Sequence, residues 1–513
     1  MDWRAEPQTS TPGREAAALK AVLALAVGLT LFRIAALFAT PLELYPDEAQ
    51  YWLWSRTLHW GYVSKPPMIA WLIAATTAIG GDREAWVRFS APIVHAGAML
   101  ALYPVGRRLY GPSVGLLAAA FYGLMPAVQV SALFIATDAP LMLFLALALW
   151  AYVAMLQAAG PRQRLLAAAG LGAALGLAFM AKQAAIYMVM GMVLHALIDR
   201  GARRAWGGWT WAAVAAALLV ALAPNLVWQA THGFATVTHT TQVNAGWSGS
   251  SLFHPGKFLE FVLGQLGVMG PIPFLVMLAG AILLGVRKAL WPQDRMLICF
   301  ALPPLLLVSV QAMVSHAHAH WAAAGYLAGV VLAAAWLIRW RAGGWIGAAL
   351  VLQGFIAALL LLAVSAPSLV DSAGFGRRLA RQRGWAETAR LVTSTAGAQT
   401  GLTAIAVEDR YLFNELAYYG RAALAVPGAP PLRVRPAPVA LNEAELSAPL
   451  KPEEGAKVLI AETAGLPPTP RLPGDFRQTA PLGRWIIPLG GRKTRDVRLY
   501  LGQDWISGPT IPP

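Results

Sequence analysis

Residues 19–39 (LKAVLALAVGLTLFRIAALFA) form an apolar stretch, and residues 40–67 (TPLELYPDEAQYWLWSRTLHWGYVSKPP) follow it as an aromatic-rich loop that holds Asp47, Glu48 and Lys65. A bilayer core takes about 20 apolar residues per helix, so the first stretch predicts a membrane span. Adjacent carboxylates at the edge of a membrane are costly beside apolar helices unless they have a function. The junction therefore predicts a membrane protein whose chemistry is centred on its first loop.

The composition of the whole chain agrees with this interpretation. Of 513 residues, 57% are hydrophobic and only 13% are charged, whereas a soluble domain carries about 25% charged residues. Twenty tryptophans are typical of a protein with two membrane interfaces. The net charge of +15 would suggest nucleic-acid binding, but the arginines fall between apolar stretches rather than on one soluble face. We therefore exclude nucleic acid as a partner and expect membrane lipids to surround the chain.

Apolar stretches of spanning length recur along the first two thirds of the chain. They predict about eleven transmembrane helices, at residues 19–39, 87–106, 113–133, 139–158, 164–181, 184–198, 208–227, 258–286, 296–314, 321–338 and 344–366. The apolar stretch 66–80 is shorter and directly follows Lys65, so it predicts a re-entrant or interfacial helix.

The arginines predict the orientation. They gather in alternate connections, at Arg107-Arg108, Arg162 with Arg164, Arg200 with Arg203-Arg204, Arg287-Lys288 with Arg295, and Arg339 with Arg341. The positive-inside rule places these connections and the N-terminus in the cytoplasm. Residues 40–66, 228–257 and 315–320, the Thr137-Asp138 turn and Lys182 then lie on the outer side, which is the periplasm if the protein is in a bacterial inner membrane.

The chain divides into two parts. Residues 1–366 predict a transmembrane catalytic domain with a first periplasmic loop at 40–86, and residues 367–513 predict a soluble periplasmic domain. The second part has proline-rich stretches and short apolar runs, at 457–461 and 484–489, that indicate strands. We therefore expect a polytopic α-helical membrane protein with a C-terminal mixed α/β domain.

The first loop offers two kinds of charged group. Asp47 and Glu48 are either functional or solvated loop acids, and Asp47 could cap a helix that begins at Glu48. Lys65 precedes a Pro-Pro pair, which restricts it to extended backbone. Its ammonium group could bind a phosphate as a fixed point charge, or it could reach toward lipid headgroups.

The other outer-side loops add further candidates. Asp138 lies in a tight turn, where it is either the N-cap of the next span or a second acid that faces Asp47. Lys182 is an isolated cation between two apolar stretches and gains a function only if it faces a cavity. His316, His318 and His320 alternate before Trp321, a pattern that allows a metal site or a polar interfacial turn. His232 and His239 are open to either interpretation.

Several of these stretches together resemble a known family. Asp47-Glu48-Ala49-Gln50-Tyr51, Trp60-Gly61-Tyr62 and Ser64-Lys65-Pro66-Pro67 are similar to the first outer loop of ArnT-like and protein O-mannosyltransferase-like enzymes, glycosyltransferase family 39 and relatives, which have the GT-C fold. Further similar stretches are Thr137-Asp138-Ala139-Pro140, Pro224-Asn225-Leu226-Val227-Trp228-Gln229, His232-Gly233-Phe234, His320-Trp321-Ala322-Ala323 with Tyr326 and, in the tail, Asp409-Arg410-Tyr411 with Tyr418-Tyr419.

The resemblance implies an inverting glycosyltransferase. It implies transfer of a sugar from a polyprenyl-phosphate-linked donor to an acceptor, which is lipid A, another glycolipid, a polysaccharide or a protein, on the periplasmic face. It also implies a role for each matching residue. Asp47 is the expected base, Asp138 is the second acid, and Lys65 binds the donor phosphate. Beyond the resemblance, cations must neutralise the phosphate as it leaves, and here Lys65 is the first choice and Lys182 the second. We also assign Glu48 to the catalytic residues. We assign to the substrate cavity Tyr45, Tyr51, Tyr62, His239, His320 and Trp321.

One residue departs from the family pattern. Ser64 stands where the aminoarabinose transferases have a glutamate that helps to hold a metal. We therefore assign no metal ligands, although a divalent metal remains possible as a cofactor. A transporter or lipid flippase is the alternative function, but no internal repeat supports it and the notable charges lie at the outer edge. A non-catalytic envelope scaffold would not require Asp47 and Lys65 in one loop.

Overall fold

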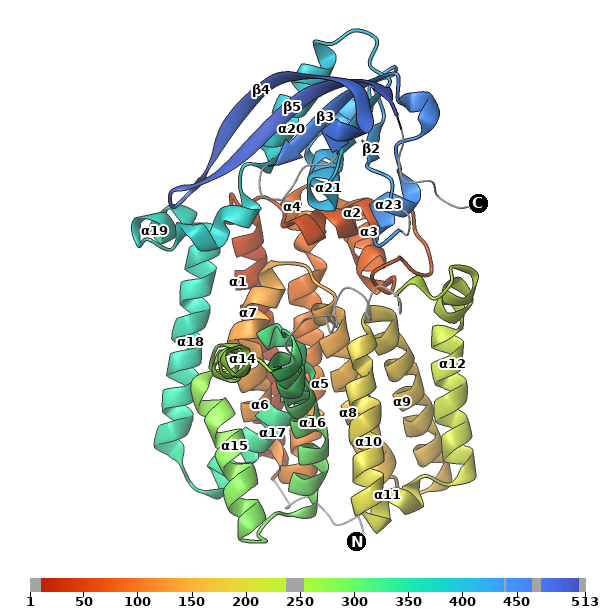
Figure 1. Cartoon of the computed structure of the whole chain (residues 1–513). Helices are drawn as coiled ribbons and strands as arrows, with labels where there is room; N and C mark the ends of the chain where they lie inside the picture. The colour runs from red at the N-terminus through yellow and green to blue at the C-terminus, as the bar shows by residue number, and fades with distance from the viewer. Residues whose placement is uncertain (1–10, 237–252, 438–439, 464–471, 507–513) are drawn as a thin grey trace.

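The computed structural model describes residues 11–236, 253–437, 440–463 and 472–506. These residues form a bundle of long helices at one end and a domain built on a β-sheet at the other. Figure 1 shows short helices from the first loop between the two parts. The polytopic helical fold with a C-terminal mixed α/β domain is confirmed.

Eight apolar helices of the described chain are long enough to cross a bilayer, two of them each built from two consecutive elements. They are α1 (Pro12–Ala39), α4 (Glu84–Arg88) with α5 (Ser90–Tyr110), α8 (Asp138–Leu156), α9 (Pro161–Ala181), α12 (Gly208–Thr231), α16 (Pro292–Val314), η3 (Ala319–Gly325) with α17 (Tyr326–Arg339), and α18 (Gly343–Ser365).

Two further spans are broken. Helices α6 (Pro112–Leu124) and α7 (Pro126–Leu133) meet at 55°. The break falls where Pro126 begins a new helix, because proline lacks the backbone N–H that would continue the old one. The carbonyl oxygen of Gly123, freed near the break, accepts hydrogen bonds of 2.6 Å each from Arg33 Nη2 and Gln129 Nε2. Side chains from within the bundle thus replace the lost helical bond.

The second break corrects the expectation of one straight span over residues 258–286. Helices α14 (Pro255–Val268) and α15 (Pro271–Val286) are bent by 116°, and α14 lies across the bundle. Gly270 at the corner has φ +97°, and Gln353 Nε2 donates a 2.9 Å hydrogen bond to the carbonyl oxygen of Met269. Hydropathy reports the burial of each residue and not the direction of the helix axis, so it could not reveal the corner.

The expected span at 184–198 is a shorter apolar helix, formed by η1 (Gln183–Ala185) and α10 (Ile186–Ile198) and followed by α11 (Arg200–Ala205). In the described part of the chain the number of spans is therefore eight, or up to ten with both bent pairs, rather than eleven. The basic connections around α11 and between α15 and α16 lie at the end of the bundle away from the sheet (Figure 1).

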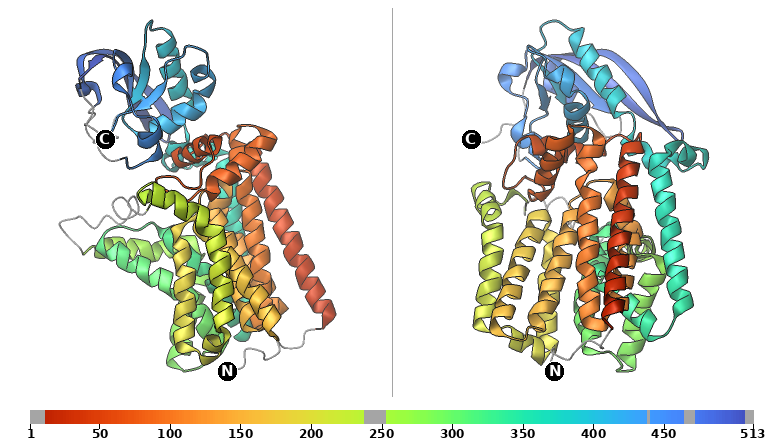
Figure 2. Two further views of the ribbon diagram at one scale, coloured as in Figure 1. Left: turned by 90° about the vertical axis from the view of Figure 1, so that its right-hand side faces the viewer. Right: turned by 180° about the vertical axis from the view of Figure 1, so that it is seen from behind.

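The first loop forms a layer of its own. It contains α2 (Pro46–Arg56) and α3 (Met68–Gly80), and α3 is the short apolar helix expected after Lys65. Both views of Figure 2 show this red-orange segment between the bundle and the sheet domain. Helix α2 packs against α21 (Arg410–Tyr419) of the sheet domain, so residues of both parts meet around α2.

The sheet has five strands in the order β2-β1-β3-β5-β4. Strands β1 (Ala404–Val407), β2 (Leu432–Val434) and β3 (Lys457–Thr463) are parallel, while β5 (Lys493–Trp505) runs antiparallel to both β3 and β4 (Phe476–Gly490). The expected strands at 457–461 and 484–489 lie within β3 and β4. The remaining elements of the domain are α19 (Pro367–Ser372), η4 (Gly376–Gln382), α20 (Trp385–Gly397), α21 (Arg410–Tyr419), α22 (Arg421–Leu424), α23 (Glu443–Ser447), η5 (Pro452–Glu454) and η6 (Leu472–Asp475).

Polar contacts fix the sheet domain to the first loop. The carboxylate of Glu43 accepts hydrogen bonds from the backbone N–H groups of Trp385 and Ala386, at the start of α20. Free N–H groups at a helix start favour such an anion. The hydroxyl of Tyr419 accepts a 2.8 Å bond from the N–H of Leu44. These contacts hold the sheet domain against the first loop.

Candidate functional site

Glu48 is the structural anchor of α2. Its carboxylate accepts hydrogen bonds from Arg88 Nε (2.9 Å) and Arg88 Nη2 (2.7 Å) and from the backbone N–H groups of Tyr45 (2.8 Å) and Ile135 (2.9 Å). Both side chains of the Arg88–Glu48 ion pair are buried. With four donors around it, this carboxylate ties α2 to α4 and to the segment before α8. We infer from these contacts that Glu48 positions α2, while its assignment as a catalytic acid stays a prediction.

We expect Glu48→Gln to unfold at a clearly lower temperature than the unchanged protein. Removing one partner of a buried ion pair leaves an uncompensated charge, here on Arg88, and costs about 3 kcal/mol or more. Thermal unfolding followed by tryptophan fluorescence in detergent measures this. Glu260→Gln, which changes an exposed glutamate on α14, is the control. Equal melting temperatures for both variants would refute the anchoring role.

Asp47 is adjacent to Glu48 but is differently placed. Helix α2 begins at Pro46, and Glu48 rather than Asp47 bonds the backbone of the N-cap residue Tyr45, so the capping interpretation of Asp47 is wrong. The side chain of Asp47 is 41% exposed, and Arg410 Nη2 lies 3.9 Å from its Oδ1. A carboxylate with this open, weakly paired position can accept a proton.

Lys65 lies in the segment between α2 and α3. Its backbone carbonyl accepts a 3.1 Å bond from the N–H of Tyr62, while the N–H of Val63 is held at 3.0 Å by Glu443 of α23. Burial lowers the pKa of Lys65 to about 8, as does the charge of Lys182. Within the described residues no hydrogen bond or ion pair engages its ammonium group. Lys65 is thus a positioned cation available to an anion.

Asp138 and Lys182 form the third element of the site. Asp138 is the first residue of α8, Thr137 is its N-cap, and no side chain caps the helix, so the capping alternative is wrong here as well. Lys182 Nζ donates to both carboxylate oxygens of Asp138, at 2.8 and 2.9 Å. The charges of Asp47, Asp138 and Lys182 all act on the pKa of Lys65, so these four groups are electrostatic neighbours.

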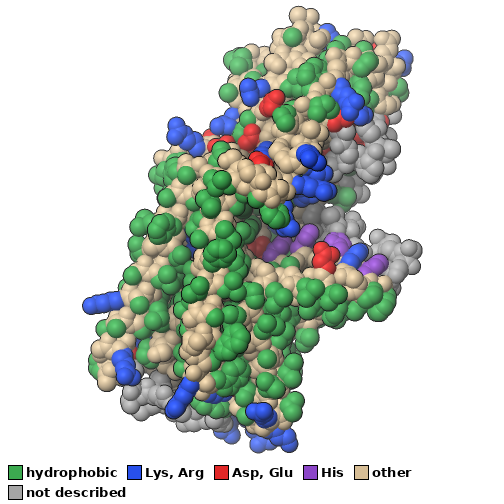
Figure 3. All heavy atoms as spheres, turned by 90° about the vertical axis from the view of Figure 1, so that its left-hand side faces the viewer, with side chains coloured by type: hydrophobic (Ala, Val, Ile, Leu, Met, Phe, Trp, Pro, Cys, Tyr) green, Lys and Arg blue, Asp and Glu red, His purple; other side chains and the backbone are tan. Residues whose placement is uncertain are grey.

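The histidine segment forms another wall. His316, His318 and His320 are exposed, the rings of His318 and His320 stack at 5.7 Å, and the ring of Trp321 meets His318 edge-on at 5.2 Å. Figure 3 shows a hollow between the sheet domain and the bundle, with histidine, acidic and basic side chains on its walls. Among the described residues no three His, Cys, Asp or Glu side chains are arranged to hold a metal ion.

The tyrosines assigned to the substrate cavity are placed in three ways. Tyr45 is half-buried, and its hydroxyl accepts a bond from Arg381 Nη1. Tyr51 is buried, and burial together with the charges of Asp47 and Asp138 raises its pKa, which keeps its hydroxyl protonated. Tyr62 is not brought to the hollow: its ring stacks on Trp54 at 4.5 Å, and its hydroxyl contacts the carbonyl oxygens of Trp54 and Thr57.

His239 lies outside the described residues, so its assignment to the substrate cavity stays a prediction.

Two cations of the site come from the sheet domain. Arg410, at the start of α21, pairs with Asp47 and donates a 3.1 Å bond to Gln50 Oε1, and Arg381 of η4 contacts Tyr45. Sequence reasoning did not assign either arginine to the site. One sequence feature could have pointed to Arg410 as a site residue. It lies in the Asp409-Arg410-Tyr411 stretch, which resembles the family although the rest of the tail suggested no function.

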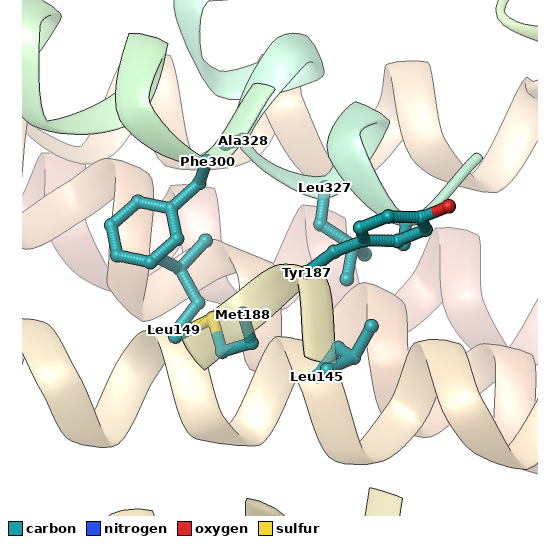
Figure 4. A pocket seen from close by; sticks show the side chains of 8 residues that line it. Leu145, Leu149, Tyr187, Met188, Phe300, Leu327 and Ala328 are labelled. Carbon is teal, nitrogen blue, oxygen red and sulfur yellow. The ribbon is translucent and has the colours of Figure 1, made fainter. Parts of the chain in front are cut away.

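An apolar pocket lies within the bundle. Figure 4 shows its lining side chains, which come from α8, α10, α16 and the η3–α17 segment: Leu145, Leu149, Tyr187, Met188, Phe300, Ala324, Leu327 and Ala328. Leu145 and Leu149 follow Asp138 on α8 by two and three turns, or about 10 and 16 Å along the axis. The charged site and the pocket therefore share the wall made by α8.

Comparisons with known proteins agree on one kind of relative. Residues 64–228 match the family model described as dolichyl-phosphate-mannose-protein mannosyltransferase. The chain is 36% identical over 399 residues to the lipid A galacturonosyltransferase RgtD of Rhizobium johnstonii, which covers 77% of this chain and 82% of RgtD.

Solved structures show the same fold. ArnT from Cupriavidus metallidurans in the apo state superposes with a TM-score of 0.63 at 16% identity, covering 95% of this chain and 99% of ArnT. The same protein bound to undecaprenyl phosphate superposes with a TM-score of 0.62 at 17% identity over the same shares.

Proposed function

Because the chain belongs to the ArnT-like family of GT-C membrane glycosyltransferases, together with RgtD, we propose that it transfers an acidic sugar from a polyprenyl phosphate to lipid A. That it is a multi-pass membrane glycosyltransferase using a polyprenyl-phosphate-linked sugar follows from this membership. The observation that supports the proposal is the direct Asp138–Lys182 ion pair, whose charges act on Lys65 together with that of Asp47.

The proposed reaction is a single displacement. The acceptor hydroxyl attacks the anomeric carbon, the new C–O bond forms, and the bond to the phosphate oxygen breaks with its electron pair leaving on polyprenyl phosphate. Asp47 takes the proton of the hydroxyl, since a neutral hydroxyl is a poor nucleophile. Lys65 and Lys182 stabilise the charge that develops on the phosphate, so no strong acid is needed to expel it. Attack opposite the leaving group inverts the anomeric carbon.

In this proposal Asp138 acts through Lys182. Its two hydrogen bonds fix the direction of the ammonium group, and the third ammonium hydrogen remains for the phosphate. Asp138 is thus a positioning residue for the phosphate site. In this proposal the lipid chain of the donor enters from the membrane.

The charge balance of the hollow favours an acidic sugar. Four cations, Lys65, Lys182, Arg381 and Arg410, face two carboxylates, Asp47 and Asp138. A polyprenyl-phosphate uronate carries one charge on the phosphate and one on the sugar, which balances the excess. A donor with a neutral sugar leaves one positive charge unbalanced. RgtD is named for a galacturonosyl group, which agrees with this argument.

The experiment is a donor comparison with purified protein and lipid A. We expect kcat/KM for a polyprenyl-phosphate galacturonate to exceed that for a matched neutral galactose donor by about tenfold or more, since each ionic contact to a desolvated carboxylate adds about 1.5 kcal/mol. Mass spectrometry of the lipid A product measures both rates. Equal rates would refute the acidic sugar and leave the transferase assignment standing. Transfer from neither donor would refute the polyprenyl-phosphate reaction.

Localisation in a bacterial inner membrane with the hollow on the periplasmic side is part of the same proposal. The basic connections lie at the end of the bundle opposite the sheet domain, which the positive-inside rule assigns to the cytoplasm.

The contact between Arg410 and Asp47 makes the sheet domain a part of the site. We expect Arg410→Gln to lower kcat about tenfold with a small change in KM for the donor, because the guanidinium holds Gln50 at 3.1 Å and places a positive charge 3.9 Å from Asp47. Arg410→Lys, which keeps the charge and loses the forked geometry, recovers part of the rate. Arg477→Gln, an exposed arginine of β4, is the matched control. An unchanged kcat in Arg410→Gln would remove Arg410 from the site.

A further inference from the structure

The long β4–β5 hairpin extends from the sheet to the surface of the bundle at α19 (Figure 1). Helix α18 has 23 residues, about 35 Å at 1.5 Å per residue, which spans the hydrocarbon core. Helix α19 begins at Pro367, two residues after α18 ends at Ser365. The short chain between them places α19 at the bilayer surface on the side of the sheet domain.

The hairpin turn is docked on this segment. A Cβ atom at Gly491 would lie 2.6 Å from the backbone nitrogen of Arg377, so the turn approaches η4 as closely as only glycine permits. Arg383 Nη1 donates to both carboxylate oxygens of Asp371, at 2.9 Å each, and to the carbonyl oxygen of Leu489 at 3.3 Å. These contacts make the turn and the α19–η4 segment one surface.

That surface is basic and unpaired. Arg377, Arg378, Arg492 and Lys493 are exposed, and in the described residues none of them has an ion pair or side-chain hydrogen bond. We call these four residues the basic tip patch. The nearby acid, Asp371, is already engaged by Arg383. Four like charges held together by tight packing favour an anionic partner.

Apolar side chains flank the basic tip patch. Phe375 is 59% exposed and Leu369 is 53% exposed, and both lie in the segment that follows the span. Exposed apolar residues beside cations at the end of a membrane helix are typical of contact with the interfacial region of a bilayer. A soluble anionic partner would leave these two side chains in water.

We propose that the basic tip patch binds the phosphate groups of anionic glycerophospholipids at the bilayer surface and thereby holds the sheet domain on the membrane. The cations contact the headgroups while Phe375 and Leu369 enter the interface. Because η4 also contains Arg381, which contacts Tyr45, this docking also holds η4 in place beside the first loop. The proposal does not depend on which sugar is transferred.

The test compares two variants that each remove three positive charges. The first is Arg378→Ser with Arg492→Ser and Lys493→Ser. The control is Arg390→Ser with Lys451→Ser and Arg477→Ser, three exposed cations elsewhere on the sheet domain. Arg477 and the turn lie at opposite ends of β4, about 40 Å apart. Native mass spectrometry of the full chain counts phosphatidylglycerol bound at increasing lipid concentration.

We expect the patch variant to bind at least one phosphatidylglycerol fewer than the control, with no difference when phosphatidylcholine is titrated. A fluorophore on Ser372→Cys in a Cys299→Ser background gives a second measurement. Its emission should shift to the blue in phosphatidylglycerol nanodiscs relative to phosphatidylcholine nanodiscs, and the patch substitutions should abolish this shift. Identical lipid counts for patch and control variants would overturn the proposal, as would a label shift that survives the substitutions.

Discussion

Asp47→Asn should lower kcat for sugar transfer by about 10²- to 10⁴-fold, with little change in donor KM or in melting temperature. Loss of a general base removes this much rate, because the acceptor hydroxyl must then lose its proton to water. Folding should be preserved because the side chain is 41% exposed and its ion pair with Arg410 is long, at 3.9 Å. Pairs of this kind contribute little to stability. Single-turnover transfer from a radiolabelled donor measures the chemical step directly.

Asp82→Asn is the matched control for this variant. Asp82 belongs to the same loop, is similarly exposed at 33%, and pairs with Arg56 at 3.0 Å, on the side of α2 where Trp52 Nε1 also donates to it. We expect at most a small change in transfer rate, because an asparagine oxygen can still accept these bonds. A rate in Asp47→Asn that matches that of Asp82→Asn would show that Asp47 is not the base.

Positions along the chain were predictable where the signal is local. Hydropathy located the apolar stretches of the described chain, since transfer into lipid depends on composition over about 20 residues, but it did not resolve the broken helices among them. The first loop was located because it combines charges with a Pro-Pro restriction within 21 residues, from Asp47 to Pro67. The family resemblance then supplied roles for Asp47 and Lys65 that residue chemistry alone left open.

Pairings between distant residues were not predictable in the same way. Asp47 and Glu48 are adjacent acids in sequence, yet one is 41% exposed and the other is buried against Arg88, 40 positions further along. Arg410 reaches the site from 360 positions beyond Gln50. A single sequence carries no information about such contacts, because many partners would satisfy the same charge. The corner at Gly270 was also not predicted. The Gly-Pro pair at 270–271 indicates a helix break, but the bond from Gln353 to Met269 that holds the corner joins residues far apart in the chain.

Lys65→Met should combine a loss of activity with a gain in stability. We expect kcat/KM for the donor to fall about 10²- to 10³-fold, the effect of removing one group that stabilises developing charge. The melting temperature should rise, because a lysine whose pKa is lowered by burial and by Lys182 destabilises the fold while it is charged. Lys451→Met, which changes an exposed lysine of the sheet domain, should alter neither quantity.

The dependence of both quantities on pH sharpens this prediction. The pKa of Lys65 is about 8 in the folded protein and 10.5 when unperturbed, so between these values the unfolded chain binds the extra proton. The free energy of unfolding therefore rises with pH across this window, and Lys65→Met lacks this pH-dependent contribution. Donor binding runs the opposite way, since the ammonium group loses its charge above pH 8. Two results together would contradict the prediction. One is a kcat/KM of the unchanged protein that stays flat from pH 7 to pH 9, and the other is a melting-temperature difference from Lys65→Met that stays constant over the same range. They would mean that Lys65 is neither buried as a cation nor used to bind the phosphate.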